Sequence, residues 1–362
     1  MSEQTTQGHV DDFLRFCIEK KASDLHIAAN MPPMARINGE LSSLAETVLS
    51  EPEVKELIYA ILSDDQIRMY ETNHELDMSY TIKGLSRFRV NVYRERGAVA
   101  AAFRVIPTKN PVLADLHMPA IVGELTNKQR GLILVTGMTG SGKSTTLAAM
   151  IGKINKERHC HILTIEDPIE YLYQNELAVI HQRELGSDTN TFAAALKYAL
   201  RQDPDVILVG EMRDLETMQL AISAAETGHL VFATVHANTA HTTVERIIDV
   251  FPQGQQDQIR TQLSNSVEAV VSQQLLPTID GKGRVAAVEI MIASAAIRNL
   301  IRSNKASQIP NAIETGINVG MQSMDQSLAG LVEQGLISAD VAVDHAGNQE
   351  NLKRLLLRVP VK

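Results

Sequence analysis

The stretch that decides the fold runs from Gly131 to Ile151 and reads GLILVTGMTGSGKSTTLAAMI. Its middle part, Gly137 to Ser144, matches the phosphate-binding loop pattern G-x-x-x-x-G-K-[ST]. The apolar run before the loop predicts a strand, and the pattern after it predicts a helix. A match inside this strand–loop–helix frame is much rarer by chance than the bare pattern. The sequence therefore predicts an α/β fold that binds a nucleotide.

The chemistry of such a loop assigns a role to each part of it. Backbone N–H groups of the glycine-rich turn wrap a phosphate chain, and the following helix N-terminus adds partial positive charge. We expect Lys143 to reach the β- and γ-phosphates and the Ser144 hydroxyl to hold Mg²⁺. The predicted nucleotide-binding residues are Gly137, Met138, Thr139, Gly140, Ser141, Gly142, Lys143, Ser144, Thr145 and Thr146.

Composition limits the function classes. The 362 residues include 34 Lys and Arg against 43 Asp and Glu, a net charge of −9, which argues against a nucleic-acid partner. Two cysteines, Cys17 and Cys160, form no C-x-x-C pair, so we expect no zinc site and a reducing compartment. A polar N-terminus and the lack of a long apolar run predict a cytoplasmic protein that docks on a membrane through a partner.

The expected secondary structure changes along the chain. Residues 1–107 mix helix and strand patterns, and residues 108–119 follow Pro107 as a proline-containing linker. Residues 120–294 alternate strands with helices, which is typical of a largely parallel sheet covered on both faces. The expected strands are Leu132–Thr136, His161–Ile165, Val206–Val209 and Leu230–Thr234. Residues 295–362 are expected to be helical, with a tail that ends in a packed helix or a docking peptide.

Acidic residues follow one expected strand in Leu163–Glu170, LTIEDPIE. Ligands of open α/β sheets bind at the carboxyl ends of the strands, so Glu166 and Asp167 should meet the γ-phosphate, its Mg²⁺ and a water. Phosphoryl transfer needs one carboxylate to orient that water. The alternative is a capping cluster ahead of Pro168.

Two further motifs follow in the same domain. Glu211 comes after the strand Val206–Val209 and Gly210, one step later than the Asp that most phosphate-loop enzymes place there, and can hold Mg²⁺ through water. His229 and His236 bracket the strand Leu230–Thr234, and a neutral histidine there could report the phosphate state. A paired metal site is not expected from their spacing.

The first domain contributes a group of arginines that includes Arg87, Arg89 and Arg104. Strand alternation puts Arg87 and Arg89 on one face. One interpretation of these arginines is that they form a solvated charged face of the sheet. The other is that in a ring these arginines reach a nucleotide held by the same or a neighbouring subunit, where an arginine finger is worth roughly 10³–10⁵ in turnover.

Taken together, these motifs resemble those of the secretion-superfamily motor ATPases. The phosphate loop, Thr164–Glu170, Gly210-Glu211 and Gly228–His236 match, in order, that family's phosphate loop, aspartate box, Walker B site and histidine box. Within the family the chain is most similar to the retraction ATPases of type IV pili, as in Ala22–His26, Ser86–Asn91 and Ala296–Arg302. Met138 stands where that family usually has proline, and the segment beyond Ile337 has no counterpart.

The resemblance implies a fold, a mechanism and partners. It implies a PAS-like N-terminal α+β domain, a RecA-like ATPase core, and a homohexamer that binds ATP and Mg²⁺. Glu166 would be the general base, Glu211 the Walker B acid and a metal residue with Ser144, and His229 and His236 the catalytic histidine box. The motor would power pilus retraction, pilin depolymerisation and twitching motility from the cytoplasmic side of the inner membrane, on a platform protein.

Three other functions remain open. Val235–Asn238 and Gln274–Thr278 are similar to the accessory retraction ATPases, which suggests a subunit that works with a paralogous motor. A pilus-assembly or type II secretion ATPase is less expected, because such proteins usually carry a tetracysteine zinc module. A nucleic-acid motor conflicts with the acidic charge.

Overall fold

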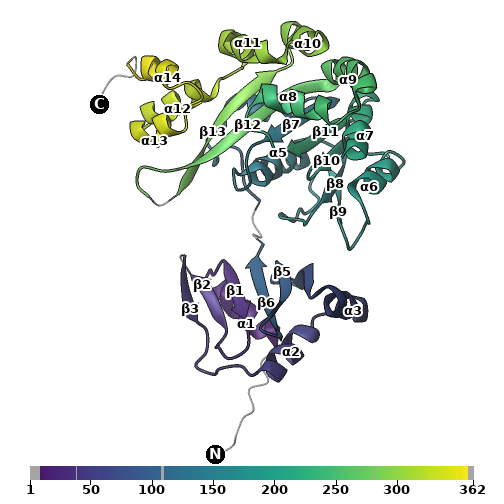
Figure 1. Ribbon diagram of the computed structural model, residues 1–362, viewed down its shortest axis with the longest axis vertical. Helices are drawn as coiled ribbons and strands as arrows, with labels where there is room; N and C mark the ends of the chain where they lie inside the picture. Colours follow the sequence, from purple (N-terminus) through teal and green to yellow (C-terminus); the bar gives the residue numbers. More distant parts are fainter. Residues whose placement is uncertain (1–8, 38, 107–109, 282, 358–362) are drawn as a thin grey trace, which may run out of the picture. The chain divides into compact units, whose positions relative to one another are not determined.

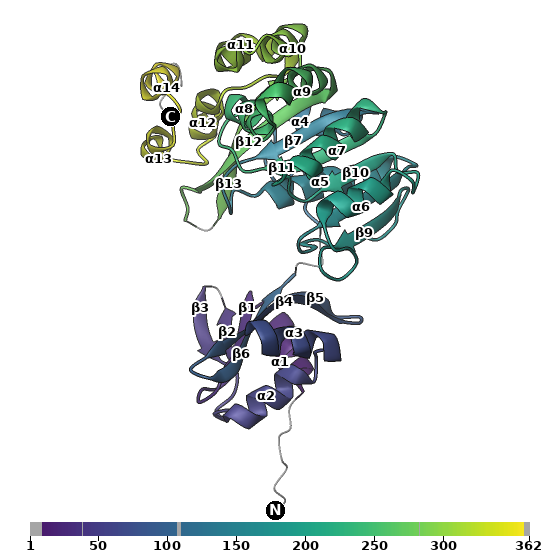
Figure 2. The ribbon, with the colours of Figure 1, turned by 45° about the vertical axis from the view of Figure 1, so that its right-hand side comes forward.

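The protein is described from a computed structural model that covers residues 9–37, 39–106, 110–281 and 283–357. The chain divides after Lys109 into two compact units, which are drawn in Figures 1 and 2. Part of the expected linker, residues 108 and 109, lies outside the described residues, as does Asn38 in the expected hairpin turn.

The first unit is built on a six-stranded sheet in which every pairing is antiparallel, in the order β3-β2-β1-β6-β5-β4. Its strands are β1 (Asp24–Ile27), β2 (Met34–Ile37), β3 (Glu40–Ser43), β4 (Glu75–Ile82), β5 (Ser86–Glu95) and β6 (Ala98–Val105). Its helices are α1 (Val10–Glu19), α2 (Glu51–Tyr59) and α3 (Asp64–Asn73).

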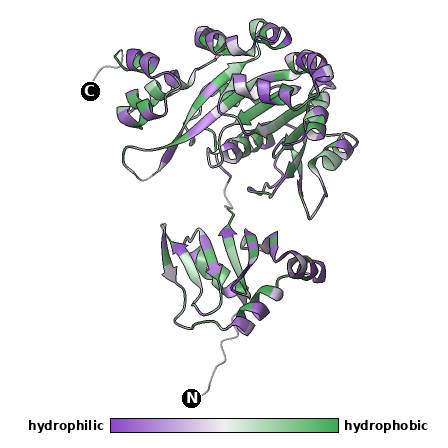
Figure 3. Cartoon of the chain, in the orientation of Figure 1, coloured by the Kyte–Doolittle hydropathy of each residue, from purple (hydrophilic) through white to green (hydrophobic). Residues whose placement is uncertain are grey.

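One face of this sheet makes the core of the unit. Alternate residues of β5, namely Phe88, Val90 and Val92, are fully buried and pack with residues of all three helices. The residues between them face the other way, so the strands show alternating green and purple bands in Figure 3. The second face is therefore polar, as is usual for an antiparallel sheet that is covered on one side.

The second unit contains a seven-stranded sheet in the order β13-β12-β7-β11-β10-β8-β9. Its strands are β7 (Gly131–Thr136), β8 (His161–Glu166), β9 (Val179–Glu184), β10 (Val206–Val209), β11 (Leu230–Val235), β12 (Val267–Pro277) and β13 (Arg284–Ile292). All pairings are parallel except that of β13 with β12. The four strands expected from the sequence are present, and β9, β12 and β13 are additional.

Helices cover both faces of this sheet, as Figures 1 and 2 show. The helices up to β13 are α4 (Ala120–Leu125), α5 (Lys143–Glu157), α6 (Phe192–Ala199), α7 (Leu215–Glu226), α8 (Ala240–Asp249) and α9 (Gln253–Ser266). One face packs against α4 and α5, and the other against α6 to α9. The central strands β7, β10 and β11 are buried along their whole length, which explains their continuous apolar sequences.

The chain ends in a helical region with its own small core. Its helices are α10 (Ala295–Arg302), η1 (Ala306–Gln308), α11 (Ile309–Thr315), η2 (Ile317–Val319), α12 (Met324–Glu333), α13 (Ala339–Asp344) and α14 (Gln349–Leu356). Leu352 of α14 is fully buried against the β12–β13 hairpin and α12. The buried carboxylate of Asp325 accepts hydrogen bonds from the backbone of Gly347 and Asn348 and so ties α14 to α12.

Candidate active site

The phosphate loop connects β7 to α5, and its glycines are required by both conformation and space. Gly137, Gly140 and Gly142 have φ values of 145°, 80° and 88°, in the region that favours glycine. A Cβ at Gly137 would lie 2.4 Å from the carbonyl oxygen of Gln273, and one at Gly142 would lie 3.0 Å from its side-chain nitrogen. The loop therefore sits directly against β12, and larger residues would push it away.

Polar groups of the loop point into a turn that is shaped for an anion. Lys143 Nζ donates to the carbonyl oxygens of Gly137 and Met138, at 2.9 and 3.0 Å. Burial lowers the pKa of Lys143, although the charges of Glu211 and Glu170 oppose this shift. The Ser141 hydroxyl is buried and has no hydrogen-bond partner among the described residues. Met138, Thr139 and Gly140 are exposed at the tip of the loop.

The first residues of α5 continue the site. Ser144 is the second residue of α5, after Lys143, where the helix N-terminus adds partial positive charge. Thr145 Oγ1 lies 3.0 Å from the Tyr171 hydroxyl, which links the helix to the segment after β8. Thr146 is buried in the core.

Glu166 ends β8 at the same edge of the sheet as the phosphate loop. Its Oε1 accepts hydrogen bonds from Thr164 Oγ1 at 2.6 Å and from Gln182 Nε2 at 3.2 Å. Burial raises the pKa of Glu166 to about 7, against the lowering effect of these hydrogen bonds. A carboxyl group that titrates near neutral pH is suited to accept a proton during turnover.

Glu211 follows β10 and is held by two cationic or polar groups. Its Oε1 lies 3.0 Å from His236 Nε2, and its Oε2 accepts from Arg213 Nη2 at 2.6 Å. Desolvation raises the pKa of Glu211, but the Arg213 hydrogen bond and the charges of His236 and Arg213 outweigh it and hold this pKa below its usual value. Glu211 is therefore a carboxylate at neutral pH.

Gly210 brings the Glu166 and Glu211 strands together. Its N–H donates to the carbonyl oxygen of Ile165 at 2.7 Å, and an added Cβ would lie 3.1 Å from that oxygen and 3.2 Å from Glu166 Cα. Thr234 of β11 donates to the Gly210 carbonyl oxygen at 2.6 Å. The glycine before Glu211 thus allows two strand ends to approach closely, which the sequence pattern alone did not explain.

The two histidines lie at opposite ends of β11. His236 follows the strand at the phosphate-loop edge, whereas His229 precedes it, with Nδ1 3.0 Å from the Ala224 carbonyl oxygen. A strand of this length separates its ends by roughly 20 Å. Within one chain, His229 therefore lies outside the site that the other predicted residues of the second unit form.

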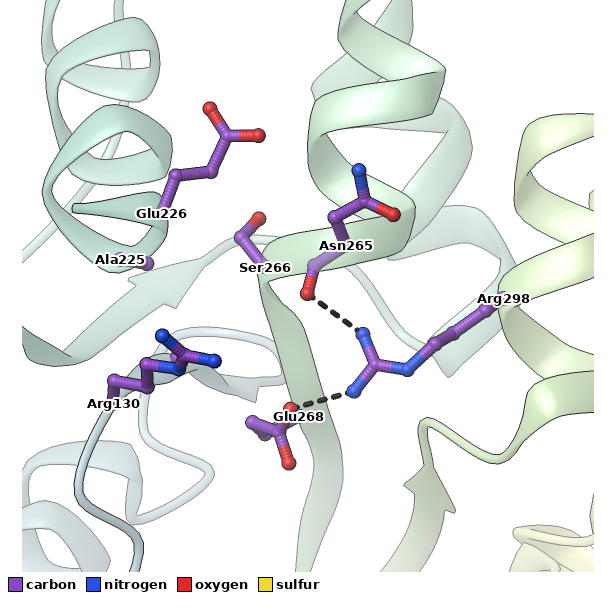
Figure 4. A pocket seen from close by; sticks show the side chains of 8 residues that line it. Arg130, Ala225, Glu226, Asn265, Ser266, Glu268 and Arg298 are labelled. Carbon is purple, nitrogen blue, oxygen red and sulfur yellow. Dashed lines mark hydrogen bonds and ion pairs between the residues drawn. The ribbon is translucent and has the colours of Figure 1, made fainter. Parts of the chain in front are cut away.

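A cavity lies at the amino-terminal ends of β7 and β12, near His229, and Figure 4 shows its lining. Arg298 of α10 donates to the Asn265 carbonyl oxygen at 2.9 Å and to Glu268 Oε1 at 2.5 Å, and Lys128 holds the other oxygen of Glu268 at 2.8 Å. These bonds satisfy carbonyl groups at the end of α9 and neutralise the acid. The cavity is a packing junction between α9, α10 and β12, on the side away from the phosphate loop.

The predicted arginines all belong to the first unit. Arg87 and Arg89 share the polar face of β5, and Arg104 stands beside Arg89 on β6. Arg104 Nε donates to Asp24 Oδ1 at 2.8 Å. Their role at a nucleotide stays a prediction.

Several residues that contact the site were not predicted from the sequence, among them Thr164 and Arg213, which bind Glu166 and Glu211. Gln182 of β9 binds Glu166, Tyr171 binds Thr145, and buried Gln273 of β12 donates to the Ser141 carbonyl oxygen at 2.6 Å. The pair Gln273-Gln274 inside an apolar run is the one sequence signal that could have drawn attention to β12.

The described residues hold neither a cluster of metal-binding side chains nor a membrane-spanning helix. Within those ranges, no three His, Cys, Asp or Glu side chains are grouped to hold a metal ion. No helix in them is long and apolar enough to cross a membrane.

The chain is similar to known proteins over nearly its whole length. A family model described as "Type II/IV secretion system protein" matches residues 2–336. The chain is 47% identical over 342 residues to the "Type IV pilus retractation ATPase PilT" of Pseudomonas aeruginosa, covering 94% of this chain and 99% of that protein. It is 41% identical over 346 residues to the type IV pilus ATPase PilU of the same organism, covering 96% and 91%. A crystal structure of the pilus retraction motor PilT with bound ADP superposes with a TM-score of 0.90 at 46% identity, over 96% of this chain and 99% of that one.

Proposed function

The chain belongs to the type II/IV secretion system protein family and is an ATPase of the class that retracts type IV pili, and from this premise we propose how its residues perform the work. We assign nucleotide binding to the phosphate loop, proton abstraction to Glu166 and metal support to Ser144 and Glu211. The observation that carries the proposal is the meeting of these groups at the carboxyl ends of β7, β8 and β10.

ATP and Mg²⁺ fit the residues at this edge. The turn carries no side chains at Gly137, Gly140 and Gly142, which leaves its backbone N–H groups uncovered for a phosphate, and the buried Ser141 hydroxyl has no hydrogen-bond partner among the described residues. Ser144 would hold Mg²⁺ directly, whereas both oxygens of Glu211 are already engaged by His236 and Arg213 and would reach the metal through water. When bound, Mg²⁺ neutralises charge on the β- and γ-phosphates.

Hydrolysis then proceeds by attack of a water molecule on the γ-phosphorus. The new phosphorus–oxygen bond forms as the bond to the β–γ bridging oxygen breaks, and ADP leaves with that oxygen. Glu166 accepts the proton that the water loses, and Lys143 stabilises charge on the phosphate oxygens. His236 keeps Glu211 oriented.

The mechanical function requires an assembly. We propose a homohexamer in which the arginines of the first unit, Arg87, Arg89 and Arg104, approach a nucleotide held by a subunit of the ring. Its motion would act on an inner-membrane platform protein, so that the enzyme works at the cytoplasmic face of that membrane and depolymerises pilin. This part of the proposal rests on the family and on the exposed, polar face that carries the arginines.

The test is turnover by two variants. Glu166→Gln should lose at least about a hundredfold in ATPase rate while it still binds ATP, because an amide cannot accept the proton. Lys143→Ala should lose both nucleotide binding and turnover. Robust hydrolysis by Glu166→Gln would overturn the assignment of the base.

An accessory role is the second candidate, because the PilU relative is 41% identical over nearly the whole chain. An accessory subunit would bind ATP in a well-formed ring but turn it over only beside a paralogous motor. Substantial ATPase activity of the purified protein alone would favour the primary motor.

A further inference from the structure

Gln182 occupies an unusual position between the proposed base and the segment that follows it. Its side-chain nitrogen donates to Glu166 Oε1 at 3.2 Å and to the Tyr171 carbonyl oxygen at 2.8 Å, and its oxygen accepts from the Tyr173 N–H at 3.0 Å. Both N–H groups and the oxygen of the amide are therefore used. A flipped amide would turn its oxygen toward two acceptors and its NH₂ toward a donor, so the orientation is fixed by its partners.

This arrangement determines which oxygen of Glu166 can take a proton. Oε1 accepts from both Thr164 and Gln182, which fills its two acceptor positions. The proton removed from water must then go to Oε2. Both donors, together with the backbone N–H of Glu170, favour the carboxylate and oppose the effect of burial, which favours the neutral acid.

We propose that Gln182 is a positioning residue for ATP hydrolysis, which holds Glu166 by Oε1 so that Oε2 faces the attacking water and receives its proton. The inference rests on the proposed role of Glu166. It adds a residue from the edge strand β9, which contributes no side chain to the phosphate loop itself.

Other titratable groups surround Glu166 and belong in the argument. The charge of Glu170 raises the pKa of Glu166, and desolvation together with the charge of Glu166 raises the pKa of partly buried Tyr173. Glu184 stands opposite Glu166 in the β8–β9 register and accepts from the Ile169 N–H at 2.9 Å. Among the described neighbours, Gln182 and Thr164 supply side-chain donors against these acids.

A purely structural role for Gln182 is the competing explanation, because it also anchors the 171–173 segment. The chain offers a matched control in Asn155 of α5. Its side chain donates to the Gln174 carbonyl oxygen at 2.8 Å and accepts from the Glu176 N–H at 3.1 Å. Asn155 thus anchors the next part of the same segment without a hydrogen bond to Glu166.

The experiment measures the pH dependence of kcat and KM for ATP in the full-length protein. Gln182→Met removes the donors with little change in size, so the acidic limb should move to higher pH. With a base near pH 7, losing one such hydrogen bond predicts about a fivefold lower kcat at pH 7 but less than about a twofold loss at pH 9. KM should be unchanged.

Two variants make the result decisive. Gln182→Glu keeps an acceptor for the Tyr173 N–H but places a carboxylate beside Glu166, so its acidic limb should move further than that of Gln182→Met. Asn155→Leu should lower kcat equally at all pH values. A uniform loss in the Gln182 variants, or an unmoved limb, would overturn the inference. Glu166→Gln separates the two proposals. If this variant keeps its ATPase activity, the assignment of Glu166 as the base is wrong. If it is inactive and the acidic limb of the Gln182 variants does not move, only the role of Gln182 is misassigned.

Discussion

At the scale of single residues, Glu166 should link pH to stability. Burial raises its pKa from 4.5 to about 7, so the folded protein holds this proton more tightly than the unfolded chain. The resulting stability is complete below pH 4.5 and is lost as the pH rises through 7. Glu166→Gln, which never ionises, should therefore be more stable than the wild type by about 3 kcal/mol at pH 8 but by less than about 1 kcal/mol at pH 5.

Denaturant unfolding of the second unit at several pH values measures this difference. An advantage of Glu166→Gln that does not change between pH 5 and pH 8 would contradict the raised pKa. The residue that we propose as the catalytic base is thus one that costs stability under working conditions, which is expected where a charge is kept in a poorly solvated site.

At the scale of elements, the closest approach in the site is between the ends of β8 and β10. In Gly210→Ala the new Cβ would lie 3.1 Å from the Ile165 carbonyl oxygen, so one strand end must shift by a few tenths of an ångström. We expect a stability loss of about 1–2 kcal/mol and, because Glu166 moves with the strand, about a tenfold lower kcat. ATPase assays and thermal unfolding measure both effects.

Gly152→Ala is the matched control, because an added Cβ there meets nothing within 4 Å and the residue lies inside α5. It should keep full turnover and gain up to about 1 kcal/mol from helix propensity. If Gly210→Ala had wild-type kcat, the close packing of the two strand ends would not govern the position of Glu166.

The elements also explain how far the sequence could predict the fold and site. Parallel strands place their carboxyl ends at one edge, so the meeting of Lys143, Glu166 and Glu211 followed from the strand pattern alone. The edge strand β9, VIHQRE, has little apolar periodicity, and β12 and β13 mix Val, Ile and Leu with Ala and Glu, residues that suit helix as well as strand. These segments form strands because they pair with strands that are distant in the sequence.

Contacts between distant elements likewise limited the prediction of the site. Gln182 and Gln273 touch the base and the loop through strand neighbours that the sequence does not reveal. For His229 the residues and the resemblance pointed in different directions: the sequence pattern put a strand between His229 and His236, whereas the family resemblance grouped both in one histidine box. The direction of β11 decides which histidine reaches the nucleotide edge.

At the scale of the whole molecule, each unit has a hydrophobic core made of its own residues, and the arginines stand on a polar face of the first. If they act on the nucleotide of a neighbouring subunit, two inactive variants should complement each other. Arg89→Ala keeps an intact phosphate loop, and Lys143→Ala keeps its arginines. In randomly mixed rings about a quarter of the head-to-tail interfaces would combine both intact halves.

An equal mixture of the two variants, co-expressed with different tags and purified through both, should therefore recover up to about a quarter of wild-type turnover. Light scattering must show hexamers in the same sample, because monomers would leave the sites incomplete. Arg68→Ala, an exposed arginine on α3, should leave turnover unchanged. If Arg89→Ala is inactive alone and the mixed hexamers recover no activity, Arg89 acts within its own subunit, and the ring would then be needed for force rather than for completing the catalytic site.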